Sequence, residues 1–220
     1  AVTNPDSKEV IGIVVYWNEG RSDDDAITEK DAGYGHGLVM ALNNAGEYQW
    51  SIEKVNQANP PFPDINSEST MRSDFMGIAK NRVLADNTNY PAFYYAKRYS
   101  PAPDVTTNNS GWFLGSGGQW LAILGTNGLG ADATAVPWEA GNHNNSQLNI
   151  TNINAALAET GTTSTEFSLK EYKGYATSSE NSTDYGVAFF FNYRTAGGME
   201  IGTIIKSTTN VRVVRPLLAF

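Results

Sequence analysis

Apolar residues near both ends of the chain form short runs rich in β-branched side chains. Residues 9–17 read EVIGIVVYW and residues 36–44 read HGLVMALNN, with a polar and acidic stretch between them. Towards the C-terminus the runs GVAFFFNY, MEIGTIIKS and VRVVRPLLAF are separated by RTAGG and TTN. Runs of this length between turn-forming residues are typical of β-strands. We therefore predict an antiparallel strand pair at the N-terminus and further strands at the C-terminus.

The middle of the chain has a helical period instead. Residues 67–87 place apolar side chains three and four positions apart behind serine and threonine cap candidates, which predicts an amphipathic helix. A second helix is predicted after a glycine-rich turn within residues 110–130, and a third over residues 148–161. Residues 90–101 are predicted to be irregular or a short helix. The expected fold class is therefore α+β, with mixed or antiparallel sheets, two to three helices in the middle and paired N- and C-terminal strands.

Three consecutive phenylalanines stand in one of the predicted C-terminal strands. In a strand, Val187, Phe189 and Phe191 face one side, while Ala188 and Phe190 face the other. At least one of these faces must belong to the core. If both faces are covered, the hairpin that contains this strand is central to the domain.

Composition narrows the class of protein. The 220 residues fit a single domain, 1–220, and carry a formal net charge of -8, which disfavours a nucleic-acid partner. Cysteine is absent, so disulfides and thiolate chemistry are excluded. No apolar stretch is long enough to insert in a membrane. We interpret the chain as a mature or excised protein from which any export signal has been removed, with a surface typical of extracellular or periplasmic proteins.

Candidate catalytic and metal-binding residues are few. The two histidines, His36 in YGHGL and His143 in a polar stretch, are interpreted as turn or surface residues. The acidic segment of residues 22–31 has enough carboxylates for a hard cation, but its spacing matches no EF-hand, and a solvated loop is favoured. A glycan-cleaving enzyme would rest only on scattered carboxylates. We therefore expect no enzyme activity, no cofactor and no metal.

Several motifs occur in an order that resembles a known family. They are GHGLVMAL, YPAFYYAKRY, SGWFLGSGGQWLAIL, INAALAETG, GYATSSE, GVAFFFNY and KSTTNVRVVRPLLAF. From about Val10 to Phe220 the chain is similar to C-type-lectin-like domains in surface proteins of gut Bacteroidales and to a related bacterial domain of unknown function. It departs from the family at Gly115, where a proline is usual, and at Ala176, where a tryptophan is usual.

The resemblance implies a C-type-lectin-like fold that displays a variable surface on a rigid base. It also implies that the chain is the C-terminal or mature part of a larger exported bacterial protein, extracellular or at the cell surface. Distant relatives are the formylglycine-generating and sulfatase-modifying enzymes and the receptor-binding proteins diversified by retroelements. The chemistry of the former needs reactive cysteine, which this chain lacks. In the latter, the variable residues lie in the C-terminal part of the domain, which directs attention to the C-terminal hairpin here.

The function expected is therefore recognition without catalysis: a surface module or pilus-tip adhesin that binds a glycan or a protein through its C-terminal hairpin loops. Tyrosine, asparagine, serine and arginine are favoured on such surfaces. The alternative is a structural or assembly module of a bacterial surface appendage or lipoprotein. The oligomeric state stays open. The candidate ligand-binding residues are Ser178, Glu180, Asn181, Asp184, Tyr185, Asn192, Tyr193 and Arg194.

Overall fold

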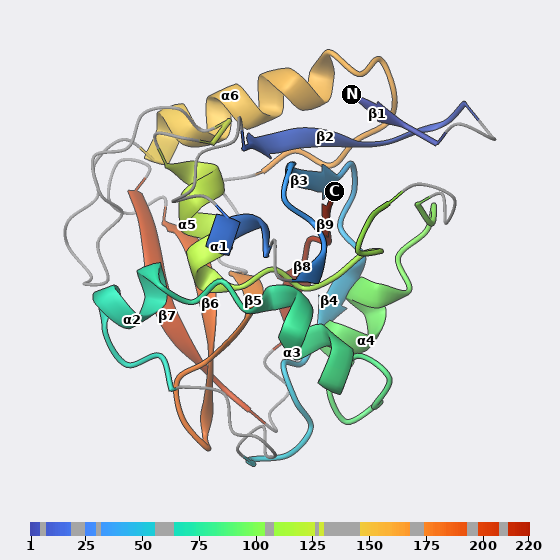
Figure 1. Ribbon diagram of the computed structural model, residues 1–220. Helices are drawn as coiled ribbons and strands as arrows, with labels where there is room; N and C mark the ends of the chain where they lie inside the picture. Colours follow the sequence, from blue (N-terminus) through green and yellow to red (C-terminus); the bar gives the residue numbers. More distant parts are fainter. Residues whose placement is uncertain are drawn as a thin grey trace.

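The structure is a computed structural model, and it confirms the α+β class through two sheets and several helices (Figure 1). The residues that it describes are 1–4, 8–18, 25–29, 32–55, 64–103, 108–125, 128–129, 146–167, 174–192, 198–206 and 211–220.

A four-stranded antiparallel sheet joins the two ends of the chain, and we call it the terminal-strand sheet. Its order is β1 (Val2–Thr3), β2 (Val10–Trp17), β3 (Gly37–Ala41) and β9 (Leu217–Ala219). The predicted antiparallel pair of N-terminal strands is confirmed as β2 and β3. Because β9 pairs with β3, the predicted pairing of N- and C-terminal strands is also confirmed, and Figure 1 places both termini at this sheet.

The second sheet is five-stranded and mixed. Its order is β4 (Gly46–Tyr48), β8 (Arg212–Val214), β5 (Tyr175–Glu180), β6 (Tyr185–Asn192) and β7 (Gly198–Ile205). Strands β5 and β8 are parallel, whereas the other pairs are antiparallel. Strand β5, with the sequence YATSSE, contains Ser178 and Glu180, which are expected in a hairpin loop, and that expectation is wrong. Its hydroxyl-bearing side chains show no apolar alternation, yet all six residues are buried.

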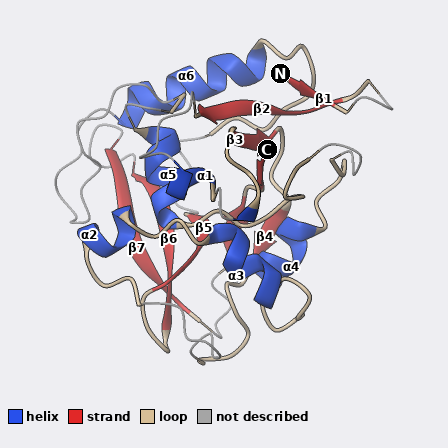
Figure 2. Ribbon diagram, viewed as in Figure 1, coloured by secondary structure: helices blue, strands red, loops and turns tan. Residues whose placement is uncertain are grey.

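The described residues form six helices, more than the two to three expected. They are α1 (Asp25–Thr28), α2 (Glu68–Arg72), α3 (Gly77–Leu84), α4 (Pro91–Lys97), α5 (Gly117–Leu124) and α6 (Ser146–Ala158). Helices α5 and α6 confirm the second and third predicted helices, and α4 is the short helix of residues 90–101. Figure 2 shows α6 running along β2 and the shorter helices α3 and α4 beside the five-stranded sheet.

The single helix predicted over residues 67–87 is wrong, because the chain breaks between α2 and α3. Helix α2 begins at a capping box of Ser67 and Thr70 and ends at Ser73. Next, the side chain of Asp74 turns into the protein and accepts a bond from the backbone N–H of Met76 at 3.3 Å. Because the side chain of Asp74 lies in the core, this residue cannot lie on the outer face of a continuous helix. The helical period is therefore interrupted at Asp74.

Both faces of β6, in the five-stranded sheet, are covered. Val187 and Phe189 belong to the larger core between the two sheets, which we call the main core, together with side chains of α5 and α6. Ala188 lies in a second core with residues of α3, α4 and Trp50, and Phe190 packs against that core. Because both of its faces are covered, β6, the strand with three consecutive phenylalanines, is central to the domain.

Gly186 in β6 leaves room for the indole ring of Trp50. A Cβ atom at this position would lie 2.7 Å from two ring atoms, Cδ1 and Cγ. The ring cannot move easily, because it is buried and its Nε1 donates to the carbonyl oxygen of Thr177 at 2.8 Å. We predict that Gly186→Ala lowers the free energy of unfolding by about 1–3 kcal/mol through overpacking.

Urea unfolding of the two proteins measures this change. Thr203→Ala, on an exposed position of β7, is the matched control and should stay within about 0.5 kcal/mol of the wild type. Equal stability of the Gly186→Ala variant and the control would show that Trp50 is not held in this position.

Candidate functional site

The outer face of the terminal-strand sheet carries the candidate site. The register of β2 against β3 shifts between Val14 and Tyr16, which marks a β-bulge. Val15 and Tyr16 consequently both face the main core, whereas Val14 packs on the opposite side of the sheet. Trp17 is 49% exposed and leans on the ring of Phe220, with the ring centroids 5.8 Å apart. The bulge thus turns an aromatic side chain towards solvent.

Part of this outer face is covered by a small third core. Tyr99 and Trp112 meet edge to face at 5.4 Å, and they pack with Ile11, Val39 and Leu218 of the sheet. The indole N–H of Trp112 donates to the carbonyl oxygen of Pro101 at 2.8 Å, which fixes the ring. Val14 packs against this third core, whereas Trp17 lies outside it and is half exposed.

A pocket of about 330 Å³ lies beside this third core. Its floor is apolar and consists of side chains from β2, β3 and β9, among them Val14, Val39 and Leu218, with Trp17 and Phe220 at one side. Pockets of this size hold a small ligand or a few side chains of a partner. The arrangement is suited to burying one apolar or aromatic group against a rigid sheet.

The polar residues at the rim are already engaged. The side-chain amides of Asn4 and Asn108 donate to the carbonyl oxygens of Ala102 and Gly33, at 3.4 and 3.3 Å. The side-chain oxygen of Asn109 accepts from the N–H of Gly111 at 2.9 Å. None of the described residues that line the pocket has a titratable side chain. The described lining is therefore mainly apolar, with Thr3 and three asparagines as its polar residues.

The predicted ligand-binding residues fall into three groups. Ser178 and Glu180 lie in β5 and are fully buried, so the expectation that they belong to an exposed loop is wrong. Asn192 ends β6, but its side chain lies outside the described residues, as do Tyr193 and Arg194 altogether. The remaining three residues, Asn181, Asp184 and Tyr185, come together at one turn.

This turn joins β5 to β6 and is partly exposed. Asn181 donates to the carbonyl oxygen of Ile65 at 2.7 Å, and Asp184 pairs with Lys54 at 3.5 Å. Tyr185 is 37% exposed and lies opposite Ile205 on the neighbouring strand. A ligand could reach Asp184 and Tyr185 here. That they bind one stays a prediction.

A buried ion pair supports the same turn. The ammonium group of Lys206 contacts the Oε1 atom of Glu180 and also donates to the carbonyl oxygens of Val55 and Ser182, at 3.0 and 2.8 Å. It lies 4.5 Å from the ring of Trp50. Burial lowers the pKa of Lys206, while Glu180 acts in the opposite direction. Glu180 thus supports the turn as a buried residue. Sequence reasoning missed this role because the partner, Lys206, lies 26 residues away and leaves no local pattern.

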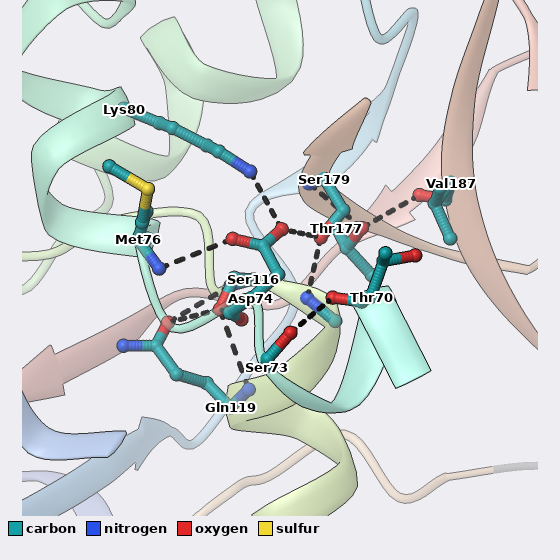
Figure 3. Close-up of polar contacts among 12 residues, drawn as sticks. Thr70, Ser73, Asp74, Met76, Lys80, Ser116, Gln119, Thr177, Ser179 and Val187 are labelled. Carbon is teal, nitrogen blue, oxygen red and sulfur yellow. Dashed lines mark hydrogen bonds and ion pairs between the residues drawn. The ribbon is translucent and has the colours of Figure 1, made fainter. Parts of the chain in front are cut away.

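A second buried network surrounds Asp74 and resembles a catalytic cluster in composition (Figure 3). The Oδ2 atom of Asp74 accepts from Lys80 at 2.7 Å and from the hydroxyl of Ser179. The backbone oxygen of Asp74 accepts from the hydroxyl of Ser116 at 2.5 Å. All four side chains are buried, so no substrate reaches them, and the network is structural.

The remaining chemical candidates give no metal site in the part of the chain that the structure describes. His36 is exposed, and its backbone bonds Asn18 and Phe220 at the start of β3, a turn position as predicted. His143 lies outside the described residues. In these residues no group of three or more histidine, cysteine, aspartate or glutamate side chains could hold a metal ion. Of the acidic segment, residues 25–29 are described, and the expectation of a solvated loop is wrong for them. Residues 25–28 form α1 with Thr28 buried, and the carboxyl group of Glu29 accepts from the N–H of Ile78 in α3.

Comparison with solved structures gives one similar protein, a fimbrial protein from Bacteroides ovatus. The likeness has a TM-score of 0.58 at 16% sequence identity and covers 100% of this chain and 46% of the other. The chain thus spans about half the length of that protein, and at this identity the likeness shows the fold. No family model matches the chain, and no curated protein matches it. Among the described helices, none has the length and hydropathy of a membrane span.

The ion pair between Glu180 and Lys206 gives a test of the turn's support. Lys206→Met leaves the carboxylate of Glu180 buried without its cation, so we predict a loss of about 3–5 kcal/mol in the free energy of unfolding. Lys54→Met, which breaks the exposed pair with Asp184, should cost less than about 1 kcal/mol. Chemical denaturation measures both values. The interpretation is wrong if the two variants lose the same amount.

Proposed function

We propose that this chain is a module of a bacterial surface appendage, and that the pocket on the terminal-strand sheet contacts a neighbouring module or subunit. The pocket carries the proposal. It leaves apolar side chains accessible on a sheet whose other face is buried in the main core. Accessible apolar surface of this kind marks protein contacts in soluble proteins.

The partner proposed is an apolar or aromatic side chain of another protein segment. The lining residues that the structure describes supply hydrophobic and aromatic contacts and carry no charged side chain, so they favour an apolar group over a charged ligand. The fimbrial protein from Bacteroides ovatus supports the same proposal, because there a fold like this one accounts for 46% of a longer chain. A domain that adjoins other domains needs a surface that contacts them.

The proposal includes an extracellular or cell-surface location and no catalysis. The buried charged residues pair with one another, Lys80 with Asp74 and Lys206 with Glu180, and they lie outside the pocket. This arrangement supports binding as the role of the pocket. The assignment to the C-type-lectin-like fold is also part of this proposal, and it rests on the motif resemblance across residues 10–220.

Removing the pocket's exposed aromatic side chain tests the function. We predict that Trp17→Ser lowers the fraction of protein incorporated in sheared appendages of the producing bacterium at least about tenfold, because an anchor worth about 1.4 kcal/mol or more is lost. Val83→Ser is the matched control, since Val83 is an exposed apolar residue on α3, at 52% exposure, away from the pocket. Total folded protein in the cell should be equal for both variants. Normal incorporation of the Trp17→Ser protein would contradict the proposal.

A second candidate function is an adhesin that binds a glycan or protein through the β5–β6 turn. It is favoured by the accessibility of Asp184 and Tyr185 beside Lys54 and by the exposed Ile205 next to Tyr185. A half-exposed aromatic residue with a polar rim is typical of recognition surfaces.

An array of glycans and extracellular proteins, probed with the purified protein, tests this candidate. We predict that Tyr185→Ala weakens any bound target at least about tenfold, because the aromatic contact is lost. Tyr95→Ala, at an exposed tyrosine on α4, serves as the control and should bind as the wild type does. Unchanged binding by the Tyr185→Ala protein would remove the turn from consideration.

A further inference from the structure

An exposed apolar patch lies at the β5–β6 turn, and we call it the turn patch. It consists of Val55, Tyr185 and Ile205, each 37% or 38% exposed. Tyr185 begins β6 and lies directly opposite Ile205, which ends β7, so their side chains project from the same face of the sheet. Val55 lies beside them, because its carbonyl oxygen accepts a bond from Lys206, the residue after Ile205.

The backbone beneath the turn patch is fixed from inside. The ammonium group of Lys206 donates to the carbonyl oxygens of Val55 and Ser182, at 3.0 and 2.8 Å, and pairs with buried Glu180. The backbone N–H of Lys206 also donates to the carbonyl oxygen of Asp184 at 2.9 Å. Three segments that are far apart in sequence are thereby tied together. Little conformational freedom of this backbone is lost when a partner binds, which favours a contact here.

Charge favours contact at the turn patch and at the pocket. Beside the turn patch Lys54 pairs with Asp184 at 3.5 Å, and beneath it Lys206 pairs with Glu180, so these four charges cancel. The described residues that line the pocket carry no charge at all. The whole chain has a formal net charge of -8, so two copies repel each other over much of their surfaces. The turn patch and the pocket are places where this repulsion is weak.

The turn patch and the pocket lie at opposite ends of the molecule. In Figure 1 the terminal-strand sheet, which forms the floor of the pocket, is at the top, whereas the beginning of β6 and the end of β7 are at the bottom. One copy can therefore use both surfaces at the same time. A contact between two different surfaces of identical chains leaves one of each surface free in the pair, so that further copies can add in a row.

We propose that the pocket of one copy receives the turn patch of a second copy of this chain, with Tyr185 and Ile205 packed against Val14 and Trp17. This rests on the proposed function, because it takes the pocket as the contact surface and names its partner. An aromatic and an aliphatic side chain on a turn are the kind of group that the apolar lining of the pocket favours. The repeated contact joins copies head to tail.

Sedimentation velocity of the purified chain tests this contact. The wild type should form oligomers that grow with concentration, and so should the control Val83→Ser, whose side chain is exposed on α3. Trp17→Ser and the double variant Tyr185→Ser/Ile205→Ser should each associate at least about tenfold more weakly, because each lacks one of the two surfaces. An equimolar mixture of these two proteins should form a two-chain species and nothing larger, since each retains the surface that the other lacks.

A wild-type chain that stays monomeric up to about 1 mM overturns the proposal, and so does a mixture of the two variants that stays monomeric. Oligomers retained by the double variant also overturn it, because the pocket would then bind another surface. If the double variant does not fold, Val55→Asp, at an exposed loop position, replaces it.

The failure of this proposal is distinguishable from that of the proposed function. If the purified wild type stays monomeric but Trp17→Ser still lowers incorporation in appendages, the pocket contacts a different protein, and the second copy is ruled out as its partner. If incorporation is also normal, both proposals fail.

Discussion

The burial of Asp74 is the constraint on which the helical layer depends. A buried carboxylate is tolerated only when it is paired and hydrogen-bonded. Here Lys80 supplies the charge, and Ser179 supplies a hydroxyl from the five-stranded sheet. The backbone oxygen of the same residue binds Ser116 at the start of α5. To reach these partners the chain must leave the helix between α2 and α3. The break sets the start of α3, and that start is the place where Glu29 docks.

The packing of the two sheets explains why the candidate site lies where it does. Strands β5 and β6 of the five-stranded sheet pack on both faces, so they contribute to the core and leave little surface for binding. The terminal-strand sheet shares its inner face with the main core, and among the described residues the third core around Tyr99 and Trp112 covers part of its outer face. The bulge in β2 then adds Trp17 to the uncovered part. Function in this protein is therefore expected at the sheet built from the chain's ends and at the turn beside Lys206.

Elements with a strong apolar period could be predicted from the sequence. The strand pair β2 and β3, the helices α5 and α6 and the C-terminal strands all follow from local patterns. Strand β5 could not be predicted, because the hydroxyl groups of Thr177 and Ser179 find their partners, Val187 and Asp74, only in the folded protein. The roles of Glu180 and Glu29 were hidden for the same reason, since each partner lies far away in sequence. The pocket was missed because it arises between strands from both ends of the chain, whereas the exposure of Asp184 and Tyr185 follows from their turn-forming neighbours.

Site-specific photo-crosslinking in the producing bacterium tests the central claim most directly. A photoreactive phenylalanine derivative in place of Trp17 puts the reactive group at the pocket, and the same derivative in place of Val83 is the comparison. The proposed contact predicts that irradiation of assembled appendages links position 17, and not position 83, covalently to a neighbouring protein segment. The absence of a link at position 17 in appendages that contain the protein would contradict the claim, as would equal linking at both positions.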